Sequence, residues 1–308
     1  MKKIWGYLVF HYHQDFHFRQ YLTVAAFVAC CLTVNYTINF ENGILDKQEG
    51  FLKLFYFFLT YAFAYYFVLL TYSIFRGDKR FWANREFIFK SLLVLLILGL
   101  DCSMPYLKKI VHHYVVTEME YWVYKMGYNL GSLVIILLPL LLYYVVCERH
   151  EGHVYGLRVR KFDFKPYVII LMVMMPLIFI AALNGNFLQQ YPMYKTSGAH
   201  RFLAKPEWFT ALIYEITYGL DFITVEFLFR GFMVIGMTKV LGRKAILPMA
   251  TTYCFIHFGK PSVEAISSIV GGSILGIIAL ETKSIWGGII VHIGIAWMME
   301  LFAYLMKS

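Results

Sequence analysis

The feature of this sequence that most restricts its fold is a series of long apolar segments separated by short polar ones. A helix needs about 20 mostly apolar residues to cross the hydrocarbon core of a bilayer. One segment, 208–240, is longer than a single crossing requires, so it predicts either two helices or one tilted helix that continues into an interfacial turn. The nine apolar segments are 21–38, 55–75, 88–100, 130–147, 167–183, 208–240, 245–258, 263–280 and 285–305.

The composition agrees with this pattern. Of the 308 residues, 60% are apolar and only 15% are charged, whereas a soluble domain carries about 25% charged residues. We therefore predict an all-α, polytopic membrane helix bundle with about eight or nine transmembrane helices and no sizeable water-soluble domain. Two stretches, 106–125 and 184–205, are too polar for spans, and we expect interfacial or extracytoplasmic loops there.

The net charge of +9 lies in short basic clusters between apolar segments rather than in one stripe. This distribution is typical of topology signals and argues against a nucleic-acid partner. The second, fourth and sixth segments are each followed by basic residues, such as Arg80, Arg149 and Lys244. We therefore expect a multi-pass protein of the cell membrane, in contact with lipid, with its N-terminus in the cytoplasm. The five cysteines form no CxxC pair, so we interpret them as small buried hydrophobic residues.

Ionisable residues within the apolar segments are concentrated in the last third of the chain. Each costs at least about 2.5 kcal/mol at mid-membrane, so each needs a partner or a water-filled cavity. Glu226 and Arg230 are four residues apart and share a helix face, with the acid N-terminal to the base. The full set is Glu215, Asp221, Glu226, Arg230, His257, His292 and Glu300.

Three interpretations of these residues stay open from position alone. A carboxylate and two imidazoles can polarise a water for attack on a carbonyl. Glu226, His257 and His292 can instead hold a divalent metal such as zinc, with a fourth position left open. The third interpretation is an internal hydrogen-bond network that only holds the helices together.

Three short motifs carry a family resemblance: VEFLFRG (Val225 to Gly231), YCFIH (Tyr253 to His257) and HIGIA (His292 to Ala296). They resemble the EExxxR, FxxxH and HxxxN/D motifs of the CAAX protease and bacteriocin-processing (CPBP or Abi) family of intramembrane endopeptidases. The resemblance covers residues 208–305. We therefore expect one membrane domain in two parts, N-terminal helices and loops over 1–206 and a CPBP-like helical core over 207–308.

The resemblance implies a hydrolase that cleaves a peptide bond in a membrane-associated peptide or protein through a water activated by Glu and His. Its expected site residues are Glu226, Arg230, His257 and His292. Two positions depart from the family pattern. In the family's prenyl endopeptidases the first Glu is thought to activate the water, and here that residue is Val225; the oxyanion-stabilising Asn is Ala296.

These departures leave two hypotheses about chemistry. In one, the site is active but uses a different carboxylate as the base. The candidates are Glu226 and Asp221, which lies one helical turn before Val225. In the other, the chain is a catalytically weakened family member that acts as a membrane scaffold, immunity or regulatory protein. A transporter is less well supported, because the first half of the chain holds no second copy of the Glu226, His257 and His292 arrangement. The substrate and any metal dependence stay open.

Overall fold

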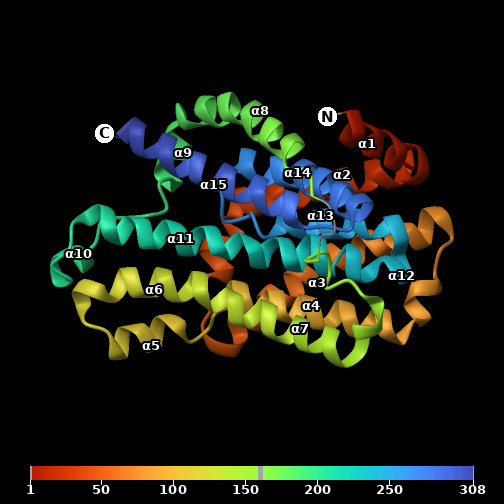
Figure 1. Cartoon of the computed structure of the whole chain (residues 1–308). Coiled ribbons are helices and arrows are strands. Elements are labelled where there is room, and N and C mark those ends of the chain that lie inside the picture. The colour runs from red at the N-terminus through yellow and green to blue at the C-terminus, as the bar shows by residue number, and fades with distance from the viewer. Residues whose placement is uncertain (1, 159–161, 308) are drawn as a thin grey trace.

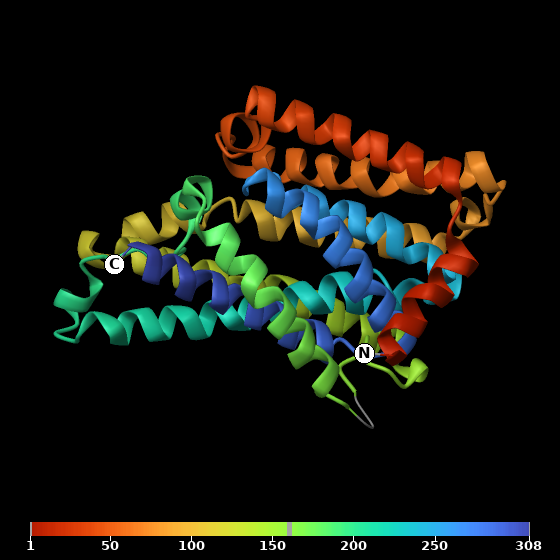
Figure 2. The ribbon, with the colours of Figure 1, turned by 90° about the horizontal axis from the view of Figure 1, so that it is seen from above.

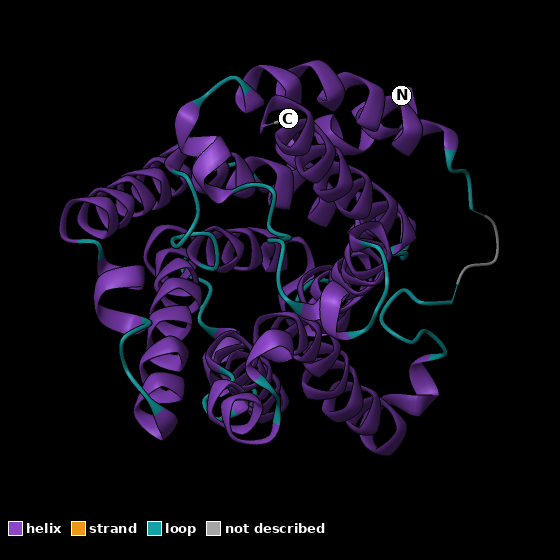
Figure 3. Cartoon of the chain, turned by 90° about the vertical axis from the view of Figure 1, so that its left-hand side faces the viewer, coloured by secondary structure: helices purple, strands orange, loops and turns teal. Residues whose placement is uncertain are grey.

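The computed structural model describes residues 2–158 and 162–307, and within those ranges every regular element is a helix (Figure 1). Most of the long helices run along one direction, and Figure 3 shows several of them end-on, gathered into a bundle. Seven helical segments are long and apolar enough to cross a membrane, which confirms the prediction of an all-α polytopic bundle. They are Phe18–Ile38 (α2), Gly50–Arg76 (α3), Arg85–Tyr114, Thr117–Glu151, Lys165–Ala182 (α8), Ser262–Thr282 (α14) and Trp286–Lys307 (α15).

Two of the nine expected segments form helices that are not among those long and apolar enough to cross a membrane. Helix α11 (Glu207–Glu226) carries four carboxylates among its 20 residues. Helix α13 (Ile246–Phe255) has ten residues, so it rises only about 15 Å. Every residue of α13 is buried, which means that the other helices enclose it and lipid does not.

The long segment 208–240 forms one helix followed by turns, rather than two spanning helices. Helix α11 continues through a wide, π-helical turn at Phe227–Phe232. The chain then breaks into the short turns Ile235–Met237, Thr238–Leu241 (α12) and Gly242–Ala245. The end of α11 and the turn beyond it are therefore held deep in the protein.

The expectation of a loop over 106–125 is wrong. This stretch forms α5 (Leu107–Tyr114) and the first half of α6 (Thr117–Ser132), which continues through turns and α7 (Leu138–Tyr143) to Glu148. Polar residues of α6 find partners on α11, since the Trp122 indole donates a 3.0 Å hydrogen bond to the Thr210 carbonyl. The stretch 184–205 contains only the short helices α9 (Gly185–Gln190) and α10 (Ala199–Phe202).

The packing places the second half of the chain at the centre. Helix α13 packs against α3 and α14, while α15 packs against α8 and α11. Figure 2 shows α2 and α3 together along one side of the molecule, with α13 and α14 beside them. Helix α1 (Lys2–Asp15) packs on α14, and α4 (Arg85–Ser103) packs on α3.

A buried ion pair fixes the turn that follows α11. Lys90 of α4 contacts Glu148, which also accepts a hydrogen bond from the Tyr155 hydroxyl. The Lys90 ammonium donates in addition to the carbonyl of Gly236. Because a buried charge without a partner is strongly unfavourable, this cluster ties three distant segments into one arrangement.

Candidate functional site

Four of the five residues predicted from the sequence lie around the junction of α11, α13 and α15. Glu226 is the last residue of α11 and Arg230 lies in the wide turn after it. His292 comes from α15, and His257 follows the end of α13. The Glu226 and Arg230 side chains are completely buried, so both depend on protein partners for their charge.

The Glu226 carboxylate joins α11 to α15. Its Oε1 atom lies 3.0 Å from Arg230 Nη1 and 2.6 Å from His292 Nδ1. The Arg230 contact is an ion pair without hydrogen-bond alignment, because Nη1 makes no hydrogen bond within the described residues. The second oxygen, Oε2, has no hydrogen-bond partner there either. It lies against Gly288, where an added Cβ would stand 1.9 Å away.

His292 is held at both ring nitrogens. Opposite Glu226, its Nε2 atom lies 2.6 Å from the Tyr253 hydroxyl. The ring also stacks on Phe222, with 5.3 Å between centroids. An ionised carboxylate only accepts hydrogen bonds, so we assign the imidazole proton to Nδ1 and the acceptor role to Nε2. In that tautomer Tyr253 donates to His292, and His292 donates to Glu226.

Tyr253 connects this chain of hydrogen bonds to Arg230. The Arg230 guanidinium carbon lies 4.3 Å from the centroid of the Tyr253 ring, which is a cation–π geometry. Gly272 of α14 makes room for the ring, because a Cβ there would lie 3.1 Å from Tyr253 Cδ1. No role of Tyr253 was predicted from the sequence, although a Tyr stands where the resembling motif has Phe. That difference was the available signal.

His257 lies in the turn after α13, and its backbone surroundings fix its tautomer. Its Nδ1 atom lies 2.7 Å from the Tyr253 carbonyl, and a carbonyl only accepts, so Nδ1 carries the proton and Nε2 keeps a lone pair. Ring centroids of Tyr253 and His257 are 4.7 Å apart. His257 is therefore a neutral base candidate beside the hydrogen-bonded chain.

Two residues from the N-terminal half hold the His257 turn in place. Asn35 of α2 donates a 2.9 Å hydrogen bond to the Phe258 carbonyl. Glu41, between α2 and α3, accepts a hydrogen bond from the Gly259 backbone, and burial raises the pKa of Glu41 to about 8. Neither residue was predicted from the sequence, because no local pattern links them to a turn more than 200 positions away.

The fifth predicted residue, Asp221, is not brought to this junction. Its carboxylate accepts hydrogen bonds from Thr224 and from Ser132 of α6. Glu300 likewise turns away from the histidines and accepts from the backbone N–H groups of Met193 and Tyr194, at 2.7 and 3.2 Å. Its role in the fold is to anchor the irregular segment before α10.

The residues present do not fit a metal centre. Among the side chains that the structure describes, no three His, Cys, Asp or Glu groups are arranged to hold a metal ion. Glu226 and His292 are hydrogen-bonded to each other, and His257 Nδ1 is taken by a backbone carbonyl. The arrangement is suited to moving protons along a chain of donors and acceptors instead.

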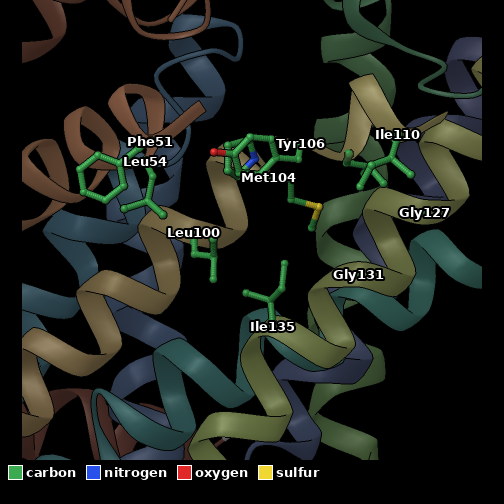
Figure 4. A pocket seen from close by; sticks show the side chains of 11 residues that line it. Phe51, Leu54, Leu100, Met104, Tyr106, Ile110, Gly127, Gly131 and Ile135 are labelled. Carbon is green, nitrogen blue, oxygen red and sulfur yellow. The ribbon is translucent and has the colours of Figure 1, made fainter. Parts of the chain in front are cut away.

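A separate apolar cavity is lined by residues outside this junction. Its volume is about 340 Å³, and Figure 4 shows side chains that line it, among them Leu100, Met104, Tyr106 and Ile135. The side chains that line it include no carboxylate, imidazole or amine. We therefore place the candidate site at the buried polar junction, on its chemistry, and not at this cavity.

The part of the chain that forms this junction is also the part that is similar to a known protein family. A family model described as "Type II CAAX prenyl endopeptidase Rce1-like" matches residues 206–298. No curated protein and no solved structure matches the sequence. The matched range contains Glu226, Arg230, Tyr253, His257 and His292, and the family resemblance inferred from the sequence is confirmed. Residues 206–298 of this multi-pass membrane protein are therefore similar to the Rce1-like CAAX prenyl endopeptidases.

Proposed function

We propose that this protein is an intramembrane endopeptidase that hydrolyses a peptide bond in a membrane-associated peptide or protein. The observation that carries the proposal is the chain of contacts from Arg230 through Glu226 and His292 to Tyr253, with His257 beside it. A buried ion pair contributes little net stability, and ionisable groups inside a membrane are costly. A network of this kind is therefore expected to serve chemistry.

In the proposed reaction His257 is the general base. Its Nε2 lone pair takes a proton from a water as that water attacks the carbonyl carbon of the peptide bond. The same imidazolium then protonates the leaving amine, which completes hydrolysis without net proton change on the protein. Glu226, held by Arg230, orients His292 and supplies the negative charge behind it.

Asp221 has no part in this proposal. Its hydrogen bonds go to Thr224 and Ser132, so a base role would require it to leave those partners. Val225, in the position expected for a water-activating Glu, is half-buried against the hydrophobic core. The proposal therefore assigns the base role to the histidine.

A second function, that of a non-catalytic membrane scaffold or regulatory protein, is favoured by two specific observations. Val225 and Ala296 carry no polar side-chain atom, and the free oxygen of Glu226 is closed in by Gly288. In this alternative the polar junction only fixes helix packing. It predicts that His257→Ala leaves the cellular role intact.

The test is cleavage of a fluorogenic peptide library by purified protein in liposomes. We expect turnover by wild type and a loss of about 10²-fold or more in His257→Ala, His292→Ala and Glu226→Gln, because each removes a group needed for proton transfer or its orientation. The matched control is His113→Ala, since His113 is exposed on α5. A chelator should change nothing. Absence of turnover from a well-folded wild type would favour the scaffold.

A further inference from the structure

The Tyr253 hydroxyl is the polar group of the junction that the proposed reaction does not use. It is nearly inaccessible, with 4% of the residue exposed, yet it ends a continuous chain of contacts. The hydroxyl lies 2.6 Å from His292 Nε2, and His292 Nδ1 lies 2.6 Å from Glu226 Oε1. A hydroxyl at the end of such a chain is the atom through which the chain can act on a substrate.

The other polar groups are less suited to meeting a substrate. Both nitrogens of His292 are occupied, and the Arg230 guanidinium is completely buried against the face of the Tyr253 ring. The His292 side chain retains 14% exposure, so the junction is most accessible at His292, whose Nε2 atom the Tyr253 hydroxyl contacts. Ala296, one turn beyond His292, offers no hydrogen-bond donor in its side chain.

We propose that the Tyr253 hydroxyl is the hydrogen-bond donor that stabilises the negative charge on the oxygen of the scissile carbonyl. This inference rests on the proposed function, since it supplies the donor that peptide hydrolysis requires. It also assigns Tyr253 as a catalytic residue, because its hydroxyl touches the reacting group.

The step balances without any further reagent. Water adds to the carbonyl carbon, its proton goes to His257 Nε2, and the carbonyl π electrons move to oxygen. The Tyr253 O–H turns from His292 Nε2 to this oxygen and keeps its proton. When the C–N bond breaks, the electron pair returns from oxygen to carbon, and the proton on His257 goes to the amine. The Tyr253 hydroxyl then returns to His292.

Two neighbours prepare the hydroxyl for this role. The Arg230 cation over the ring withdraws negative charge from it and makes the O–H a stronger donor. His292 holds the hydroxyl oxygen in place before substrate arrives, so only the O–H bond has to rotate toward the substrate oxygen. Phe229 packs edge-on against the Tyr253 ring, with centroids 5.0 Å apart, and restricts its position.

The first experiment is Tyr253→Phe, assayed with the best substrate of wild type. Loss of one donor to the oxyanion costs about 10²- to 10³-fold in kcat, so we expect that decrease with KM changed less than about threefold. Tyr65→Phe is the matched control, because the Tyr65 hydroxyl is buried and has no hydrogen-bond partner among the described residues. It should leave kcat unchanged. If Tyr253→Phe retains wild-type kcat, the inference is wrong.

A second measurement separates this role from a structural one. A peptide aldehyde, whose hydrate imitates the tetrahedral intermediate, should bind Tyr253→Phe more weakly by the factor lost in kcat/KM, whereas the uncleaved parent peptide should bind equally. Equal loss of both affinities would contradict the inference.

A third variant tests rescue. Ala296→Asn places a new hydrogen-bond donor on the face of α15 that carries His292. In the Tyr253→Phe background it should recover at least about tenfold of the lost kcat. A wild type without turnover would overturn the proposed function itself.

Discussion

Gly288 determines how closely α15 approaches the carboxylate of Glu226. A Cβ at this position would lie 1.9 Å from Glu226 Oε2 and 2.6 Å from Cδ, far inside van der Waals contact. The carboxylate is the free end of a flexible side chain, so the helix can keep its place if the carboxylate moves. The contacts with His292 and Arg230 depend on that carboxylate position.

We therefore expect Gly288→Ala to impair cleavage more than folding. A displacement of about 1 Å in a catalytic arrangement can cost about 100-fold in rate, and we expect a decrease of that order in kcat. The measurement is the liposome cleavage assay together with thermal unfolding in detergent.

Gly271→Ala is the matched control for this change. Gly271 also lies inside a helix, α14, but a Cβ there would meet nothing within 4 Å. Because Ala is favoured over Gly in a helix interior by up to about 1 kcal/mol, this variant should keep full activity and be equally or more stable. Equal activity losses in both variants would contradict the role assigned to Gly288.

The residues of the site differ in how far sequence could predict them. Glu226 and Arg230 were predictable as a pair because they are four apart on one helix. The contacts of His292 with Glu226 and Tyr253 join positions 66 and 39 residues apart, and no local pattern encodes them. Asp221 looked equivalent to Glu226 in sequence, but the direction in which α11 faces its neighbours separates the two.

At the scale of elements, hydrophobicity predicted the spanning helices and failed where polar residues have partners on other helices. The spans α2, α3, α14 and α15 are mostly apolar and were expected close to their observed bounds. The start of α6 was expected as a loop because of its Glu and Lys residues, yet its packing against α11 makes it helical. The short α13 is stable because it is enclosed, not because of its length.

The turn after α13 depends on α2, and Asn35 is the link. Its side chain donates to the Phe258 carbonyl and accepts from the Glu41 N–H at 3.1 Å. Asn35→Ala leaves two backbone groups without partners, and each buried unpaired group costs about 1–3 kcal/mol. We expect a lower free energy of unfolding by that order and faster hydrogen exchange in residues 256–260, measured by mass spectrometry.

Thr33→Ala provides the control on the same helix. Thr33 is exposed, and its hydroxyl bonds only to the Ala29 carbonyl of its own helix. An exposed substitution of this kind usually changes stability by less than about 0.5 kcal/mol. Unchanged exchange in residues 256–260 of Asn35→Ala would show that the turn holds its position without α2.

At the scale of the whole molecule, ion pairs outside the spans tie distant parts of the chain together. Asp78, in the turn after α3, contacts Lys244, 166 positions away in the turn before α13. The hydrogen bond from Lys244, and then those from Arg80, lower the pKa of Asp78 to about 2, from an ordinary value of 3.8. Basic residues in such turns were interpreted from the sequence as topology signals. The cytoplasmic N-terminus inferred from them stays a prediction.

The ion pair between Asp78 and Lys244 should make the stability of the folded state depend on pH over a limited acidic range. A carboxylate with a lowered pKa stabilises the folded state above its unfolded pKa, and that contribution is lost as pH falls through the folded pKa. The Tm of wild type should therefore exceed that of Asp78→Asn by a constant amount above about pH 5, and the gap should close between about pH 4 and 2. A gap that persists at the acidic end would contradict the assignment.

The placement of Glu226 and Arg230 on one stretch of helix also matters for biogenesis. His292 is made 66 residues after Glu226, so α11 enters the translocation machinery before the partner on α15 exists. A single charged side chain would enter the membrane without an oppositely charged partner, which is costly. An acid and a base one helical turn apart can instead form an ion pair as soon as their own helix has formed. The helix thus carries its own counter-ion through insertion, and the arrival of α15 at the end of synthesis completes the polar junction last.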